Sequence, residues 1–122
     1  SHIWHGDTTS DGQRARTLVS ISVSIRNTDP VKAIRVLSAQ YYDTDGKKLK
    51  EYVTSPKLVG PMGTYELFVP RSDDTGGSGA NFVIRWQSDK PANPPVVQGF
   101  HANLPVGRSI AFATSAVVIS DE

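Results

Sequence analysis

The segment from Arg71 to Phe82 holds the densest group of residues in this chain that could do chemistry. It reads RSDDTGGSGANF, so two aspartates, Asp73 and Asp74, precede a serine, Ser78, that has glycines on both sides. Glycine-rich turns can hold phosphates, a serine in a G-x-S-x-G turn can act as a nucleophile, and neighbouring carboxylates can bind a hard cation. The surrounding residues decide between these interpretations.

The flanking sequence does not supply the partners that phosphate binding or nucleophilic catalysis requires. A phosphate-binding loop needs a lysine at the start of a helix, but this loop contains no lysine and leads into a strand-like run, 82–87. Phe82 occupies the position at which a dinucleotide fingerprint needs another glycine. A nucleophilic Ser78 needs a strand before it, a helix after it and a histidine, and His101 is the only histidine downstream. We therefore expect no enzyme activity and a tight connection over residues 76–79, with at least one glycine at positive φ.

The acidic residues admit two interpretations. Asp73 and Asp74, together with Asp43 and Asp45 of the segment DTDG, offer the oxygen ligands that calcium prefers, although DTDG lacks the twelve-residue frame of an EF-hand. Alternatively, Asp43 and Asp73 accept hydrogen bonds from nearby backbone amides in Asx-turns. We favour turns and expect no bound metal or cofactor. The alternative function is a small hydrolase or metal-binding protein that uses the glycine loop 73–81.

The N-terminal segment SHIWHGD contains two histidines and a tryptophan. Because His2 and His5 are three residues apart, they point to opposite faces of a strand and converge on a transition metal only if the chain turns, with His101 as a third ligand. We favour an edge strand with one imidazole on each face. Trp4 either contacts a partner protein or covers the core, and the sequence leaves both open. The candidate binding residues are Trp4, His5, Asp73, Asp74 and Ser78.

The elements that position these residues are predicted to be strands. Apolar residues alternate with serines over residues 19–25, which indicates a half-buried strand, and no window shows a period of 3.6. The alternation of segment 32–43 is broken, which predicts a β-bulge near Val36. Turn residues recur every eight to twelve positions. We therefore predict a single-domain antiparallel immunoglobulin-like β-sandwich of seven to eight strands over residues 1–122.

The same alternation predicts which side chains form the core and where the chain's last strand lies. We expect the last strand within residues 109–120. The predicted core consists of Val19, Ile21, Val23, Ile25, Ile34, Leu67, Val69, Phe82, Ile84, Trp86, Phe112 and Val117.

Composition excludes several classes of function. The 122 residues include no cysteine, so disulfides, thiolate metal sites and a cysteine nucleophile are excluded. The thirteen basic side chains are nearly balanced by twelve acidic ones, and the lysine cluster 47–50 is typical of a solvated hairpin tip. We therefore expect no nucleic-acid partner. No apolar run reaches ~20 residues, so we expect membrane attachment only through a leader or lipid anchor outside this chain. The chain begins at Ser1 without methionine, which fits either a removed leader or a trimmed terminus.

The segments SHIWHGD, SIRNTDP, YYDTDGK and DTGGSGANF together resemble a bacterial family, domain of unknown function 3124. The resemblance covers the chain from about His2 to the final strand. It implies a small exported protein, made with a signal or lipoprotein leader, and supplies no catalytic residues. The spacing of strands and turns is also similar to that of immunoglobulin-like accessory domains. We therefore expect a non-enzymatic, extracytoplasmic protein-binding module of the periplasm or cell envelope, an accessory or stabilising subunit of an envelope-associated complex.

Overall fold

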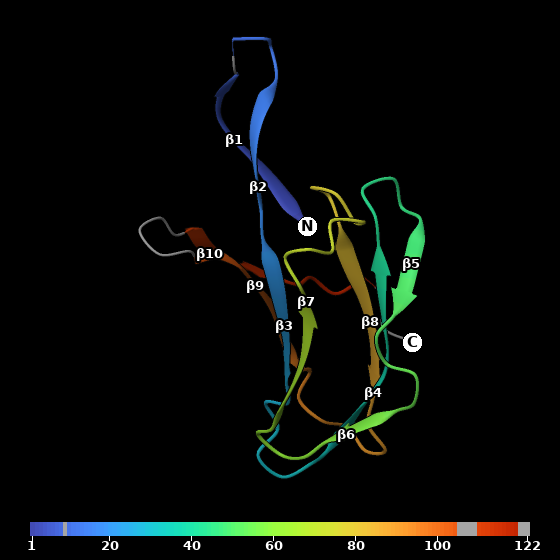
Figure 1. Cartoon of the computed structure of the whole chain (residues 1–122). Coiled ribbons are helices and arrows are strands. Elements are labelled where there is room, and N and C mark those ends of the chain that lie inside the picture. Colours follow the sequence, from blue (N-terminus) through green and yellow to red (C-terminus); the bar gives the residue numbers. More distant parts are fainter. Residues whose placement is uncertain (9, 105–109, 120–122) are drawn as a thin grey trace.

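The computed structural model describes residues 1–8, 10–104 and 110–119, and every regular element within them is a β-strand. In chain order the strands are β1 (His2–Thr8), β2 (Arg14–Leu18), β3 (Ser20–Arg26), β4 (Ile34–Tyr42), β5 (Lys48–Glu51), β6 (Lys57–Val59), β7 (Thr64–Val69), β8 (Asn81–Gln87), β9 (Val96–Asn103) and β10 (Ile110–Ser115). Figure 1 shows a body of two sheets with a two-stranded hairpin projecting from one end. None of the described segments forms a helix long and apolar enough to cross a membrane.

The two sheets form an antiparallel sandwich, as predicted. The first sheet has the order β10-β9-β3-β7. The second is built on β4, which pairs with β8 along one side and with β5 and β6 along the other. Every pairing is antiparallel. The described residues form ten strands, more than the seven to eight expected, because β1 and β2 form a separate hairpin and β6 is only three residues long.

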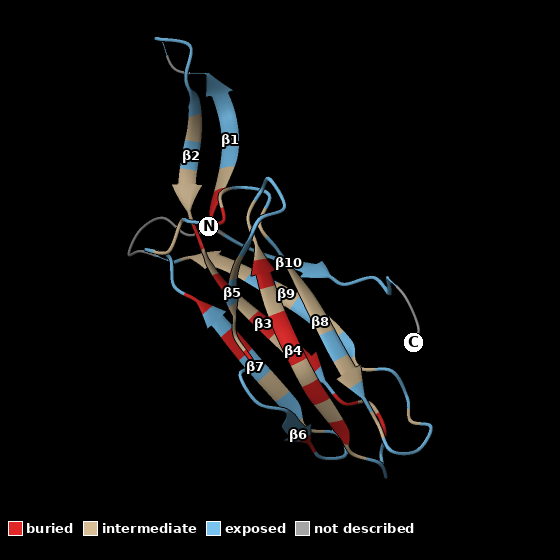
Figure 2. Ribbon diagram, turned by 90° about the vertical axis from the view of Figure 1, so that its right-hand side faces the viewer, coloured by how far each residue is buried: buried red, intermediate tan, exposed pale blue. Residues whose placement is uncertain are grey.

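The core lies between the two sheets and begins with the alternation in β3. Along β3 the apolar side chains are buried and the serines are half-buried, which confirms the predicted face of this strand. Figure 2 shows buried residues concentrated on the strands of the sandwich, while most of the hairpin is exposed. The buried cluster contains Ile21, Val23, Ile25, Ile34, Val36, Ala39, Tyr41, Val53, Val59, Leu67 and Val69, and Phe82, Ile84 and Trp86 pack against it from β8.

A β-bulge in β4 confirms the interruption that the sequence predicts near Val36. Val36 faces Trp86 of β8, but Ser38 faces Arg85, so Leu37 is an extra residue in the ladder. The bulge reverses which alternate residues face inward. Ile34 and Val36 are buried before it, and Ala39 and Tyr41 are buried after it. Without this extra residue, Tyr41 would point to solvent instead of into the core.

Two predicted core residues are exposed to solvent, whereas Phe82, Ile84 and Trp86 are half-buried. The exposed fraction is 36% for Phe112 and 85% for Val117. The prediction was wrong for Phe112 because β10 is the outermost strand of the first sheet, and for Val117 because β10 ends at Ser115. Phe112 instead stacks on His101 of β9, with 4.6 Å between ring centroids and 6° between planes. Residues 109 and 120, at the ends of the expected final strand, lie outside the described residues.

Candidate binding surface at the hairpin end

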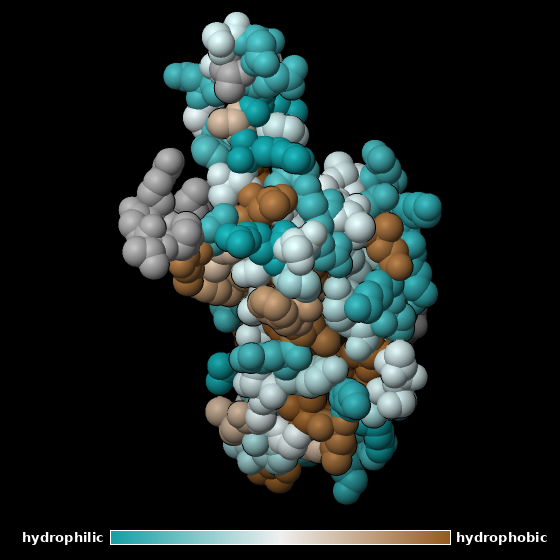
Figure 3. Space-filling view, in the orientation of Figure 1, coloured by the Kyte–Doolittle hydropathy of each residue, from teal (hydrophilic) through white to brown (hydrophobic). Residues whose placement is uncertain are grey.

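The β1–β2 hairpin extends the sandwich along one of its own strands. Val19 alone separates β2 from β3, so the chain passes from the hairpin into the first sheet almost without interruption. Most side chains of β1 and β2 are exposed, because each strand pairs only with the other. Figure 3 shows a largely hydrophilic hairpin tip, with hydrophobic patches at the hairpin base and over the sandwich. The hairpin therefore presents two open faces to solvent.

Asp74 fastens both strands of the hairpin to the glycine loop. Its Oδ1 lies 2.7 Å from Nδ1 of His2 on β1, and its Oδ2 lies 3.4 Å from Nη1 of Arg16 on β2. Because an ionised carboxylate only accepts, Nδ1 of His2 carries the hydrogen of this bond. His2 is buried whereas Arg16 is exposed, so water screens the arginine contact more strongly. We call His2, Arg16 and Asp74 the hairpin anchor.

Asp73 and Asp43 form the local turns that the sequence favours. Oδ1 of Asp73 accepts hydrogen bonds from the Thr75 hydroxyl at 2.6 Å and the Thr75 amide at 3.2 Å. The hydroxyl bond is the main reason that the pKa of Asp73 lies below its ordinary value. Oδ1 of Asp43 accepts from the amides of Asp45 and Lys47, at 3.0 and 2.8 Å. These carboxylates stabilise turns, which confirms the Asx-turn interpretation.

The glycine loop is a tight connection held against the β4–β5 turn by Thr44. The Thr44 hydroxyl donates to the carbonyl of Gly76 at 3.0 Å and accepts from the amide of Gly79 at 2.8 Å. Gly77 has φ of 71°, which confirms that one loop glycine adopts positive φ. Ser78 is exposed at the tip of the loop. Sequence reasoning missed Thr44, because a threonine inside a turn motif gives no sign of a partner 32 residues away.

Gly76 lies where a side chain would overlap the aromatic part of the core. A Cβ at this position would meet the hydroxyl of Tyr41 and would lie 2.6 Å from Cβ of Ala80. The Tyr41 hydroxyl is buried with no hydrogen-bond partner among the described residues, and burial is the main cause that raises its pKa to about 12. The Tyr41 ring packs against Phe82 and Tyr52, with centroid distances of 4.8 and 6.0 Å. Tyr41 belongs to the core cluster, and Tyr52 and Phe82 pack against it; of these three, the sequence predicted only Phe82.

Trp4 lies on the hairpin and outside the core. Its exposed fraction is 40%. The guanidinium carbon of Arg14 lies 4.5 Å from the Trp4 ring centroid, and the His2 ring meets it edge-on at 5.0 Å. These two contacts hold the indole in place while leaving much of it open to solvent. His5, further along β1, has its Nε2 2.7 Å from the Thr17 hydroxyl.

The three histidines take separate positions. His2 belongs to the hairpin anchor, and His5 forms a hydrogen bond with the Thr17 hydroxyl across the hairpin. His101 of β9 stacks on Phe112 of β10. Residues 1–8, 10–104 and 110–119 contain no group of three His, Cys, Asp or Glu side chains arranged to hold a metal ion. The expected N-terminal strand exists, but it pairs with β2 in the hairpin and not along an edge of the sandwich.

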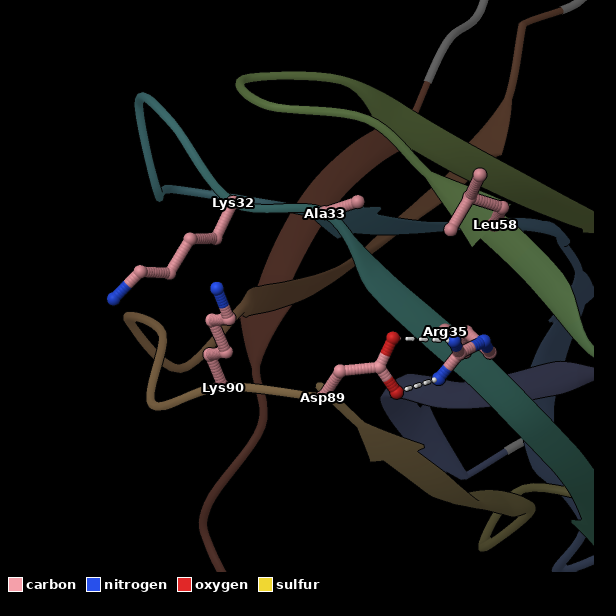
Figure 4. A pocket seen from close by; sticks show the side chains of 6 residues that line it. All are labelled: Lys32, Ala33, Arg35, Leu58, Asp89 and Lys90. Carbon is pink, nitrogen blue, oxygen red and sulfur yellow. Dashed lines mark hydrogen bonds and ion pairs between the residues drawn. The ribbon is translucent and has the colours of Figure 1, made fainter.

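A separate shallow cavity of about 220 Å³ lies at the opposite end of the second sheet, and sequence reasoning did not anticipate it. Lys32, Ala33, Arg35, Leu58, Asp89 and Lys90 line it. Figure 4 shows Arg35 and Asp89 joined by two parallel hydrogen bonds, each 2.7 Å long. These bonds raise the pKa of Arg35 and lower that of Asp89. Lys32 donates to the Pro91 carbonyl at 2.6 Å, so two of the cations already have partners.

Comparison with known proteins identifies a family but no described relative. Residues 1–119 match the family model described as protein of unknown function (DUF3124). No curated protein matches the chain, and no solved structure does.

Proposed function

With a match over nearly its whole length, the chain belongs to the DUF3124 family, and we propose that it is a non-enzymatic protein-binding module. We place it outside the cytoplasm, in the periplasm or cell envelope, as an accessory or stabilising subunit of an envelope-associated bacterial complex. The observation that carries the proposal is Trp4, a large aromatic side chain that is 40% exposed on a hairpin projecting from the sandwich. The assignment to the envelope follows from the resemblance to exported proteins.

The surroundings of Trp4 suit a contact with a protein. Tryptophan and arginine are enriched at the centres of protein interfaces, where they account for much of the binding energy. Arg14 and His2 already restrict the indole, so binding immobilises little additional side-chain freedom. The hairpin anchor fixes the direction in which the hairpin projects.

The bonding of the glycine loop supports a structural role for the residues that a hydrolase or metal site would use. Asp74 binds His2 and Arg16, and Asp73 binds Thr75. The only histidine downstream of Ser78, His101, has its Nε2 3.2 Å from the hydroxyl of Thr114 on β10. We therefore assign the loop to positioning the hairpin.

Photocrosslinking from the hairpin tests the proposal directly. A photoreactive benzoylphenylalanine replaces Trp4 in one variant and Val31 in another, with both chains produced with their native leader in their native cells. Val31 is a suitable control because it is also apolar and exposed, but lies in the turn between β3 and β4. We expect a discrete crosslinked protein from position 4 and none from position 31. Equal crosslinking from both positions contradicts the proposal.

A pull-down with matched substitutions provides the quantitative test. We expect Trp4→Ala to reduce recovery of the crosslinked protein by about fivefold or more, the loss typical of an aromatic interface residue. Leu58→Ala removes an exposed apolar side chain from β6 and should leave recovery unchanged. Recovery of the chain alone at near-native concentration counts against a binding module. Covalent labelling of Ser78 by a fluorophosphonate would instead support the hydrolase alternative.

A further inference from the structure

The free edges of the described sheets differ in how they are protected against pairing with other strands. Edge strands commonly carry charged residues or proline, which discourage such pairing. β7 contains Glu66 and is followed by Pro70, β8 contains Arg85, and the edge formed by β5 and β6 contains several lysines. β10 reads IAFATS and has neither charge nor proline nor glycine. Among the sandwich edges described, β10 lacks these protective residues.

The hydrogen-bonding direction of β10 shows which backbone groups face its free side. The amide of Ala116, just after β10, donates to the carbonyl of Val97 on β9 at 3.0 Å. Along an antiparallel pair the backbone groups point alternately toward the partner strand and away from it. The register of β10 on β9 is regular from Ile110 to Ser115. The N–H and C=O groups of alternate residues, namely Ala111, Ala113 and Ser115, therefore point away from β9.

The side chains of these outward-bonding residues are small, so another strand can approach closely. All three lie on the outer face of the first sheet, where Ala113 is directly opposite Phe100 of β9. Phe112 lies on the inner face, stacked on His101 and with 36% of its surface exposed. The edge thus combines backbone groups that pair with no described strand, small side chains and a partly uncovered aromatic ring.

We propose that β10 pairs antiparallel with β10 of a second copy of this chain. A two-fold axis perpendicular to the sheet and midway between the two strands pairs Ala113 with Ala113 of the copy, and Ala111 with Ser115 of the copy. Such pairing forms ~6 interchain N–H···O bonds, since each hydrogen-bonded pair exchanges two. Phe112 then lies opposite Thr114 of the copy, which covers part of its ring. The two four-stranded first sheets become one continuous sheet.

The occupant is a second copy because the edge is complementary to itself. Two-fold pairing places residues 111–115 of each β10 opposite residues of the same neutral strand, so no like charges meet and no charge is buried without a partner. At each end of the paired segment, Ala111 of one copy faces Ser115 of the other, so small side chains meet on the outer face at both ends. This interface consists of β10 residues and does not include β1, which carries Trp4, so it does not rest on the proposed binding function.

Sedimentation velocity over a wide concentration range tests the pairing. We expect the purified full chain to reach twice the mass of one copy as concentration rises. Ala113→Lys places two ammonium groups opposite each other on the axis and should weaken association by about tenfold or more. The matched control is Phe68→Lys on β7, which adds a lysine to the same outer face at the other edge of the sheet, at a position already 57% exposed. It should leave association unchanged.

Mixing two variants with opposite charges at position 113 distinguishes loss of pairing from loss of folding. An equal mixture of the Ala113→Lys and Ala113→Glu variants should recover association through a mixed pair, which a misfolded chain could not do. Ser115→Lys, displaced from the axis, provides a second variant that should weaken pairing if Ala113→Lys fails to fold. A wild-type chain that stays monomeric at every concentration overturns the proposal. The proposal is also overturned if Phe68→Lys and Ala113→Lys weaken association of the chain to the same extent.

Discussion

The strand that runs from β2 into β3 passes through two regions that are held in different ways. In β3, every second side chain is apolar and buried between the sheets. In β2, no side chain is fully buried, and the exposed Arg16 contributes a polar bond to Asp74 in a loop far along the sequence. Burial of apolar surface stabilises β3 at every second residue and requires no particular bond geometry. The hairpin depends instead on a few polar contacts, each of which requires a specific partner. The two regions should therefore respond differently to the same kind of substitution.

The largest effect is expected in the sandwich core. Ile25 is fully buried, so Ile25→Ala leaves a cavity and should lower the free energy of unfolding by about 2–5 kcal/mol. Urea denaturation followed by fluorescence measures this loss. Val31→Ala, at an exposed position, should change stability by no more than about 0.5 kcal/mol. Equal effects from the two substitutions would show that Ile25 does not lie in the core.

A smaller loss is expected where the glycine loop meets the core. Gly76→Ala introduces a Cβ into the space occupied by Tyr41 and Ala80 and should cost about 1–3 kcal/mol of unfolding free energy. Gly60→Ala is the matched control, because a Cβ there meets no atom within 4 Å. Tyr41→Phe removes the overlapping hydroxyl and should recover part of the loss in the double variant. Additive effects in thermal or urea denaturation would argue against this contact.

The hairpin anchor should break locally before the sandwich unfolds. Asp74→Ala leaves the buried His2 without its partner and should lower the opening free energy of the hairpin by about 1–2 kcal/mol. Hydrogen exchange of the β1 and β2 amides measures the opening, while β3 amides should keep their protection. Arg16→Ala should cost only about 0.5 kcal/mol, because this contact is exposed. Simultaneous loss of protection in β3 would mean that the hairpin and the sandwich unfold together.

The last prediction concerns the turn after β3, whose stabilisation should depend on pH. The Asp29 carboxylate accepts from the amides of Val31, Lys32 and Asn93, at 2.9, 2.8 and 3.1 Å. These bonds, with that of Val31 the largest cause, hold the pKa of Asp29 below its ordinary value of 3.8. Because the native pKa is the lower one, the stabilisation is present above pH 3.8 and is lost as pH falls through the native pKa.

Denaturation between about pH 5 and pH 2 tests this prediction. Asp29→Asn removes the titrating group, so unfolding free energy should fall less steeply with acid than in the wild type. Val31→Ala keeps the amide that binds Asp29 and should retain the wild-type slope. Parallel slopes for wild type and Asp29→Asn would mean that this carboxylate does not contribute.

The sequence by itself determined the features that depend on neighbours along the chain. Alternation in β3 identified a strand and its buried face, and the broken alternation of segment 32–43 identified the bulge beside Val36. The Asx-turn of Asp73 and the positive φ of Gly77 follow from bonds and torsions that span two residues or fewer. Such features are predictable because their energies depend on local geometry.

Only the tertiary structure decided which segments meet and which surfaces remain uncovered. His2 and Asp74 are 72 residues apart, and no local pattern selects that partner over another carboxylate. Phe112 alternates as a core residue should, but it remains partly exposed because its strand became the outermost one of the first sheet. Alternation specifies that a strand has two faces, whereas coverage of a face depends on how far the opposing sheet extends.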